Sequence, residues 1–168
     1  MRAIRITKVI LALSIGVWGL SGLIGNLVSA QEIHAEVVRV TSMAGVPEGE
    51  GPPWRTSNSV IAWFGVLAIV LGKVAATVGG LGGGVLMARK WQGTAADFEA
   101  SKNLAIAGCG LAFALSFAAF TVFAESVFFM FYDRELIGAA ELAFRFSASF
   151  ALATLFIAQG EPRTGDET

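Results

Sequence analysis

Four ionisable side chains interrupt stretches of sequence that are otherwise apolar: Lys73, Glu125, Glu141 and Arg145. Each would be costly in contact with lipid, so we expect each to face protein or a wet cavity. Glu141 and Arg145 stand four residues apart with the acid first, the favourable order for a helical ion pair. Glu125 should reach a similar depth across an antiparallel hairpin. The sequence therefore predicts one buried polar network of these four residues, with zero net charge and with Arg145 paired to both acids.

Such a network has two possible roles, a path for protons or ions and a polar staple that fixes the register of the helices. A path usually repeats polar groups along its length, and an ion site needs a ligand set. Neither is present in the sequence, so we favour the staple.

The remaining polar residues do not form a recognisable catalytic, cofactor or metal site. His34 is the only histidine and Cys109 the only cysteine, which leaves no candidate catalytic triad. Glu32, His34 and Glu36 follow steps of two, so they do not share one helical face. We therefore expect no catalytic residue, no metal site, no cofactor and no enzymatic activity.

A row of small residues is the second feature of note: Gly72, Ala76, Gly80 and Gly84 fall at steps of four. Ala75, Gly79 and Gly83 form an adjacent row. Small residues on one face let membrane helices approach closely, so we expect a packing face within the protein or against another subunit. The glycine run is not a phosphate loop, because it lacks the Lys-Ser/Thr ending.

The elements that must position these residues are four apolar helices. Of the 168 residues, 55% are hydrophobic and 15% charged, against about 25% charged in a soluble domain. The apolar residues gather in four blocks, and a helix needs about 20 of them to cross a bilayer. The sequence predicts an all-α membrane protein, an up-down bundle with helices at about 9–30, 59–88, 104–131 and 136–158. Residues 1–159 would form this domain, and 160–168 a polar cytoplasmic tail.

The first connection, residues 31–57, has its own pattern. Apolar Ile33, Val37 and Val40 alternate with charged residues at helical spacing, which predicts a short amphipathic helix on the membrane surface. An alternative for the chain before it is a signal peptide cleaved after Ala30, but its apolar run is long for one.

The basic residues predict an orientation. With the N-terminus inside, the inner segments carry seven of them and the outer segments three: Arg2, Arg5, Lys8, Arg89, Lys90, Lys102 and Arg163 against Arg39, Arg55 and Arg134. This is the positive-inside pattern, so both termini should be cytoplasmic and the 31–57 connection external.

Three stretches of the chain resemble a bacterial family of small integral membrane proteins known as domain of unknown function 2165. They are Gly25–Leu27 with Val40–Met43, then Pro53–Arg55, and finally Ala124–Met130 with Ala139–Phe146. The resemblance implies a four-helix membrane fold but no reaction or substrate. It also implies an acidic residue near the position of Lys73, where this chain departs from the pattern.

These observations favour a small accessory subunit of a larger bacterial inner-membrane complex, either energy-converting (respiratory or photosynthetic) or transporting. Its partners would be membrane lipids and other membrane subunits, and a net charge of −1 gives no reason to expect nucleic acid. The alternative is a small transporter or channel that uses Glu125, Glu141, Arg145 and Lys73. A third, weaker possibility is a membrane enzyme acting on lipid or quinone.

Overall fold

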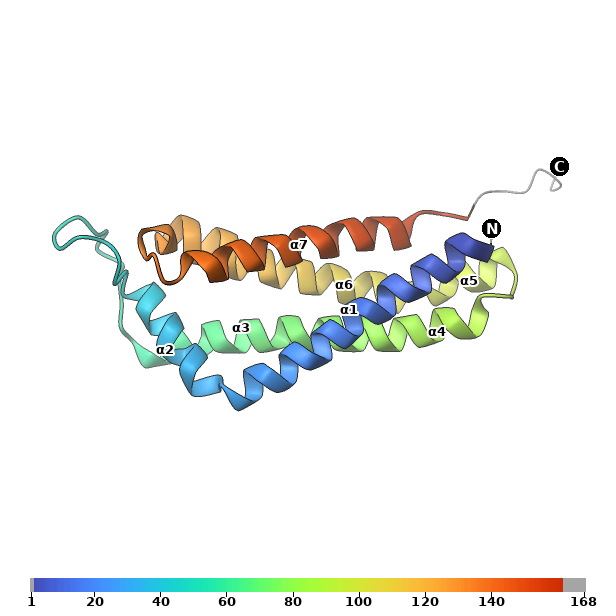
Figure 1. Cartoon of the computed structure of the whole chain (residues 1–168), viewed down its shortest axis with the longest axis horizontal. Coiled ribbons are helices and arrows are strands. Elements are labelled where there is room, and N and C mark those ends of the chain that lie inside the picture. Colours follow the sequence, from blue (N-terminus) through green and yellow to red (C-terminus); the bar gives the residue numbers. More distant parts are fainter. Residues whose placement is uncertain (1, 162–168) are drawn as a thin grey trace.

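The computed structural model describes residues 2–161, and within them the chain folds into four long helical spans and one short helix (Figure 1). The first span is α1 (Arg2–Val28), followed by the short α2 (Ala30–Thr41). The second joins α3 (Ser59–Thr77), the π-helical turn η1 (Val78–Gly82) and α4 (Gly83–Lys90). The third joins α5 (Ala95–Ser101), α6 (Asn103–Ser116) and the π-helical η2 (Phe117–Val127). The 3-10 turn η3 (Met130–Tyr132) then leads to the fourth span, α7 (Ile137–Ala158). The predicted all-α fold is confirmed.

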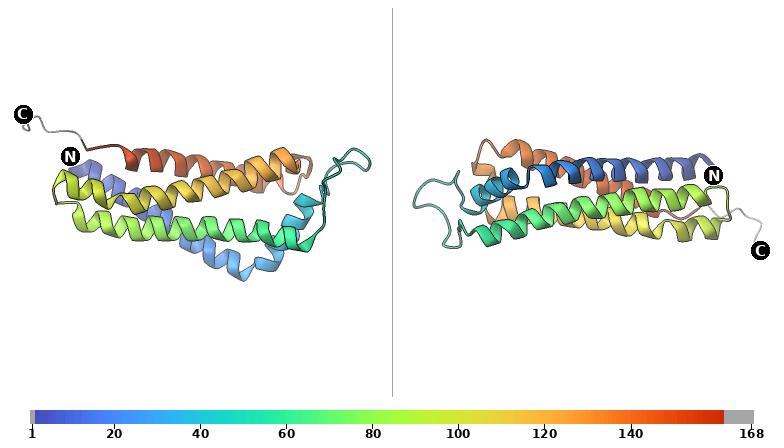
Figure 2. Two further views of the ribbon diagram at one scale, coloured as in Figure 1. Left: turned by 180° about the vertical axis from the view of Figure 1, so that it is seen from behind. Right: turned by 90° about the horizontal axis from the view of Figure 1, so that it is seen from below.

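All four spans are long and apolar enough to cross a membrane, with 27, 32, 33 and 22 residues. Their outer surface is apolar as well: Phe64 and Leu152, for example, are 67% and 69% exposed. The beginning of α1 and the end of α7 lie at one end of the molecule, here called the terminal end (Figures 1 and 2). The α2 helix and the 42–58 connection lie at the other, here called the loop end.

Several helix boundaries differ from the expected ones. The first span begins at Arg2 instead of about residue 9, and the third at Ala95 instead of about 104. Thr94 explains the second difference, because its hydroxyl caps α5 by accepting a hydrogen bond from the Asp97 amide, 3.1 Å away. The third span ends at Val127, since Phe129 adopts the left-handed conformation with φ of 53°. The short helix expected in the first connection is present as α2, and it packs on α3 with Val37 against Gly65.

The second span lies at the centre of the packing and contacts α1 on one side and α6 on the other. A β-carbon added to Gly80 would lie 2.3 Å from the Gly16 nitrogen of α1, and one added to Gly79 would lie 2.4 Å from the Gly108 Cα of α6. Ala76 and Gly84 also face α1, whereas Gly72 faces Leu115 of α6. The small-residue row is therefore a face for packing inside the chain, and the adjacent row serves the opposite neighbour.

The π-helical turn η1 lies at the crossing point of these helices. An α-helix has about 3.6 residues per turn, so a row with steps of four drifts around its axis. A wider π turn reduces this drift. It thereby keeps the small residues before and after Val78–Gly82 turned toward the same neighbours.

We expect Gly80→Ala to lower the stability of the fold by roughly 1–3 kcal/mol, because the added methyl group meets the backbone of Gly16. Cys109 is the only cysteine and is buried, so a thiol-reactive fluorophore can report unfolding by heat. Gly25→Ala is the control, since a β-carbon there would meet nothing within 4 Å. Equal unfolding temperatures for the two variants would contradict the close approach of α1 to the second span.

Candidate functional site

Two adjoining cavities open in the loop-end half of the bundle. The first, of about 270 Å³, is lined by Lys73, Trp18, Asn26 and Ser116 among others. The second, of about 430 Å³, has an almost wholly apolar lining. The two share part of their walls, including Glu36, Ala68, Ile69, Ala119, Phe120 and Ala139. We call these two adjoining cavities, between α1, α2, α3, α6, η2 and α7, the Lys73 chamber.

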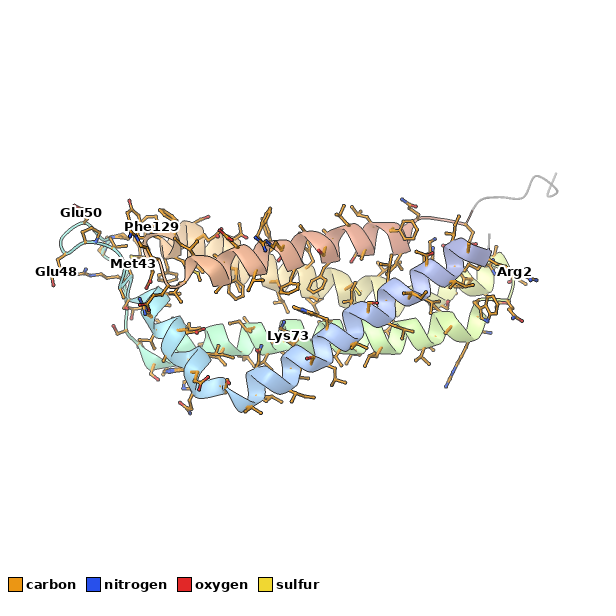
Figure 3. The ribbon with its side chains drawn as sticks, in the orientation of Figure 1. Arg2, Met43, Glu48, Glu50, Lys73 and Phe129 are labelled. Atoms are coloured by element: carbon orange, nitrogen blue, oxygen red, sulfur yellow. The ribbon has the colours of Figure 1, made fainter. Side chains whose placement is uncertain are left out.

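Lys73 is the only basic residue that lines this chamber. It lies near the middle of the long axis, with Arg2 at one end of the molecule and Glu48 and Glu50 at the other (Figure 3). Its Nζ sits 3.1 Å from the centroid of the Trp18 ring and 6.0 Å from that of Phe146. Rings at this distance attract the ammonium group through their negative faces. The Trp18 ring is therefore the main contact of this cation.

No carboxylate of residues 2–161 forms an ion pair with Lys73. Glu36 lines both cavities but is exposed. Asn26 also lines the first cavity, and its Nδ2 is buried without a hydrogen-bond partner. The chamber thus holds an ammonium group and a buried amide N–H that both lack an acceptor.

Glu141 and Arg145 do not lie in this chamber. Their side chains are 62% and 71% exposed on α7, and they form an ion pair with each other at 3.5 Å. The inward side of α7 is occupied by Leu142, Ala143 and Phe146, which line the first cavity. Four-residue spacing therefore produced the expected pair, but it faces away from the bundle.

Glu125 also differs from its expected place. It is half-buried on η2, and within the described chain it forms no ion pair with Arg145 or Lys73. The structure consequently separates the four ionisable residues, with Lys73 in the chamber, Glu141 and Arg145 on the outer surface, and Glu125 apart from both. They are not one buried network in the single chain.

The terminal end is closed by a cluster of charges that sequence reasoning treated only as flanking residues. Arg5 donates to Glu161 at 2.9 Å, and Lys102 to Glu99 at 2.8 Å. Lys8 and Lys102 are both 1% exposed and donate to the Gln159 carbonyl. These contacts tie α1 and α6 to the end of α7. The paired residues are as many as 156 positions apart in the sequence, so local spacing cannot predict these contacts.

The loop end is closed by a second cluster around Arg39 of α2. Arg39 donates to both carboxylate oxygens of buried Asp133 and to Glu135, in the turn before α7. The hydrogen bonds to Asp133 and then to Glu135 raise the pKa of Arg39 above its usual value, so its positive charge is retained at any ordinary pH. A fork of this kind fixes orientation as well as distance. It holds α2 over the second cavity.

His34 contributes to the packing at the loop end. Its Nε2 lies 3.0 Å from the Ser59 hydroxyl, and its ring centroid lies 4.7 Å from that of Trp63. In the part of the chain that the structure describes, no three His, Cys, Asp or Glu residues are grouped to hold a metal ion. His34 thus links α2 to the beginning of α3.

Comparison with known protein families gives one match: a family described as "Predicted small integral membrane protein (DUF2165)", over residues 4–160. Neither the curated proteins nor the solved structures include a match to this chain.

We expect Asp133→Asn to loosen α2, because the neutral amide cannot hold both branches of the Arg39 guanidinium. Hydrogen–deuterium exchange should rise in residues 30–58 and stay unchanged in α5 at the terminal end. Glu48→Gln, at the tip of the loop, removes an equal charge without a described contact and should change neither (Figure 3). Unaltered exchange in Asp133→Asn would show that the fork does not hold α2.

Proposed function

The chain belongs to the family of small integral membrane proteins known as domain of unknown function 2165, and from this premise we propose that it is an accessory subunit, without catalysis of its own, of a larger energy-converting or transport complex in a bacterial inner membrane. Its task would be to pack against and stabilise other membrane subunits. The observation that carries this proposal is the exposed pair of charges on α7.

Glu141 and Arg145 follow the beginning of α7 by four and eight residues. At about 1.5 Å per residue they lie roughly 6 and 12 Å along a helix that must cross about 30 Å of hydrocarbon. A charged side chain at the centre of the bilayer costs about 2.5–3.5 kcal/mol on insertion scales, and an exposed internal pair offsets only part of such a cost. A neighbouring protein surface that supplies polar partners removes this cost, so the pair supports a subunit contact on this face of α7.

The alternative function, a small transporter or channel, is favoured by a different observation, the Lys73 chamber. The chamber is a space in which a solute could be held. Glu141 and Arg145 do not line it, so the four ionisable residues do not mark one path through a single chain. A membrane enzyme acting on lipid or quinone stays the weakest of the three proposals.

The orientation that we propose places the terminal end in the cytoplasm and the loop end outside. The basic residues of the described terminal end support it: Arg2, Arg5, Lys8, Arg89, Lys90 and Lys102. Arg163, which we also counted, lies outside the described residues. Arg5, Lys8 and Lys102 are engaged in the ion cluster, so Arg2, Arg89 and Lys90 carry most of the free positive charge.

We expect a fluorescent reporter fused after Thr168 to fold and emit, and an alkaline phosphatase fused there to be inactive, as at a cytoplasmic position. The two reporters inserted between Glu48 and Glu50 should give the opposite result, because this loop lies at the other end of the bundle (Figure 3). Phosphatase activity at Thr168 alone would reverse the proposed orientation, and activity at both positions would contradict the three crossings between the loop and Thr168.

We expect the chain to co-migrate with a larger complex in blue-native electrophoresis of gently solubilised membranes. Replacing Glu141 and Arg145 together by Leu should abolish co-migration, because the partner loses its polar contacts, while the thermal unfolding of the chain is not lowered. The matched control is Leu155→Ala, which alters an exposed residue nearer the terminal end of α7. A wild-type chain found only as a free small species would refute the subunit proposal.

A further inference from the structure

The Lys73 chamber combines an anion-binding end with an apolar end. The first cavity presents the Lys73 ammonium and the Asn26 amide, neither with an acceptor among the described residues. The second is lined by apolar side chains such as Val37, Phe123 and Leu136. We propose that the chamber binds a long-chain fatty acid, with its carboxylate at Lys73 and Asn26 and its hydrocarbon chain in the second cavity.

The need for an anion follows from the surroundings of Lys73. Its ammonium group lies midway along the bundle, where a lone cation is expensive. The Trp18 ring stabilises the positive charge but accepts no conventional hydrogen bond, so the three N–H donors of the ammonium still lack oxygen acceptors. The buried Nδ2 of Asn26 has the same deficit. A carboxylate offers two acceptor oxygens and a negative charge, so it can pair with Lys73 and accept from the Asn26 amide once that side chain turns toward it.

The apolar second cavity favours a ligand with a long hydrocarbon chain. The two cavities measure about 270 and 430 Å³, each close to or within the range of roughly 300–1,000 Å³ found for ligand sites. They adjoin at Ala68, Ala119 and Phe120, which line both, so we expect the hydrocarbon chain to run from Lys73 along these shared walls toward Met130. A phospholipid would have to bring a bulky headgroup to the depth of Lys73, whereas a carboxylate is small enough to lie beside the Trp18 ring.

The chamber exists because α1 and α7 diverge toward the loop end. α1 crosses the second span at Gly16 and Gly80 and then runs away from α7 toward the loop end (Figures 1 and 2). The chamber lies in the opening that this divergence leaves. Neither cavity is fully enclosed by the described side chains, so we expect a fatty acid to enter from the surrounding lipid.

The test is binding of carboxyl-13C palmitate to the full chain in phosphatidylcholine nanodiscs, followed by carbon NMR. We expect saturable binding of one palmitate per chain. Lys73→Gln should weaken the affinity by about tenfold or more, as expected for the loss of one charge-assisted hydrogen bond, and Lys73→Arg should retain most of it. The control Lys90→Gln removes an exposed lysine from the end of the same span and should leave the affinity unchanged.

A second pair of variants tests the path of the hydrocarbon chain. Ala68→Phe places a ring in the wall that both cavities share and should abolish binding. Leu67→Phe adds a similar ring one residue away, on the exposed side of α3, and should bind as the wild type does. Equal affinity of these two variants would place the ligand elsewhere.

A third measurement locates the carboxyl end of the ligand without changing Lys73 or Asn26. A stearate with a nitroxide close to its carboxyl group should quench Trp18 more strongly than one with the nitroxide at the methyl end, since Trp18 contacts Lys73. The Trp18 contribution is obtained by difference from Trp18→Phe. Absence of saturable palmitate binding, equal binding of the corresponding long-chain alcohol, or an affinity unaffected by Lys73→Gln would each overturn the proposal, as would the reverse order of quenching.

Discussion

The fold depends on backbone contact at the centre of the second span. Membrane helices gain little from burying apolar side chains, because the lipid tails are apolar too, and close packing must stabilise them instead. Gly80 meets Gly16 on one side and Gly79 meets Gly108 on the other, so three helices touch through their main chains at one level. From this crossing α1 diverges toward the loop end. The same contact that joins the terminal half therefore opens the Lys73 chamber in the other half.

The charged residues differ between the two ends of the bundle and its middle. Each end is closed by compensated ions: Arg5 with Glu161 at the terminal end, and Arg39 with Asp133 at the loop end. Such pairs are surrounded by further donors and acceptors, as buried charges must be. Lys73, between the two closures, is held by aromatic rings alone. It differs from the fully buried Lys8 and Lys102 in having no oxygen acceptor among the described residues.

The sequence predicted those features that depend on local spacing. Four apolar blocks determine four spans, and steps of four place Gly80 in a packing row and Arg145 beside Glu141. We placed the start of the third span too late, although Thr94 and Asp97 have the spacing of a helix cap and mark the earlier start.

Local spacing does not predict the direction in which α7 turns its ion pair. A helix with apolar residues on every side has no strong polar face to orient it, so the orientation is decided by distant contacts such as Phe150 and Ile157 in the core.

The fourth span, α7, carries on opposite sides the two features from which a partner and a ligand are proposed. Leu142 and Phe146 face the Lys73 chamber, whereas Glu141 and Arg145 face outward at nearly the same depth. A subunit bound to the outward pair and a molecule held in the chamber would both contact α7. If either shifts α7 relative to α6, it changes the energy of binding the other by the same amount, since coupling between two sites is reciprocal. Any influence of the ligand on complex assembly would therefore run in both directions through α7.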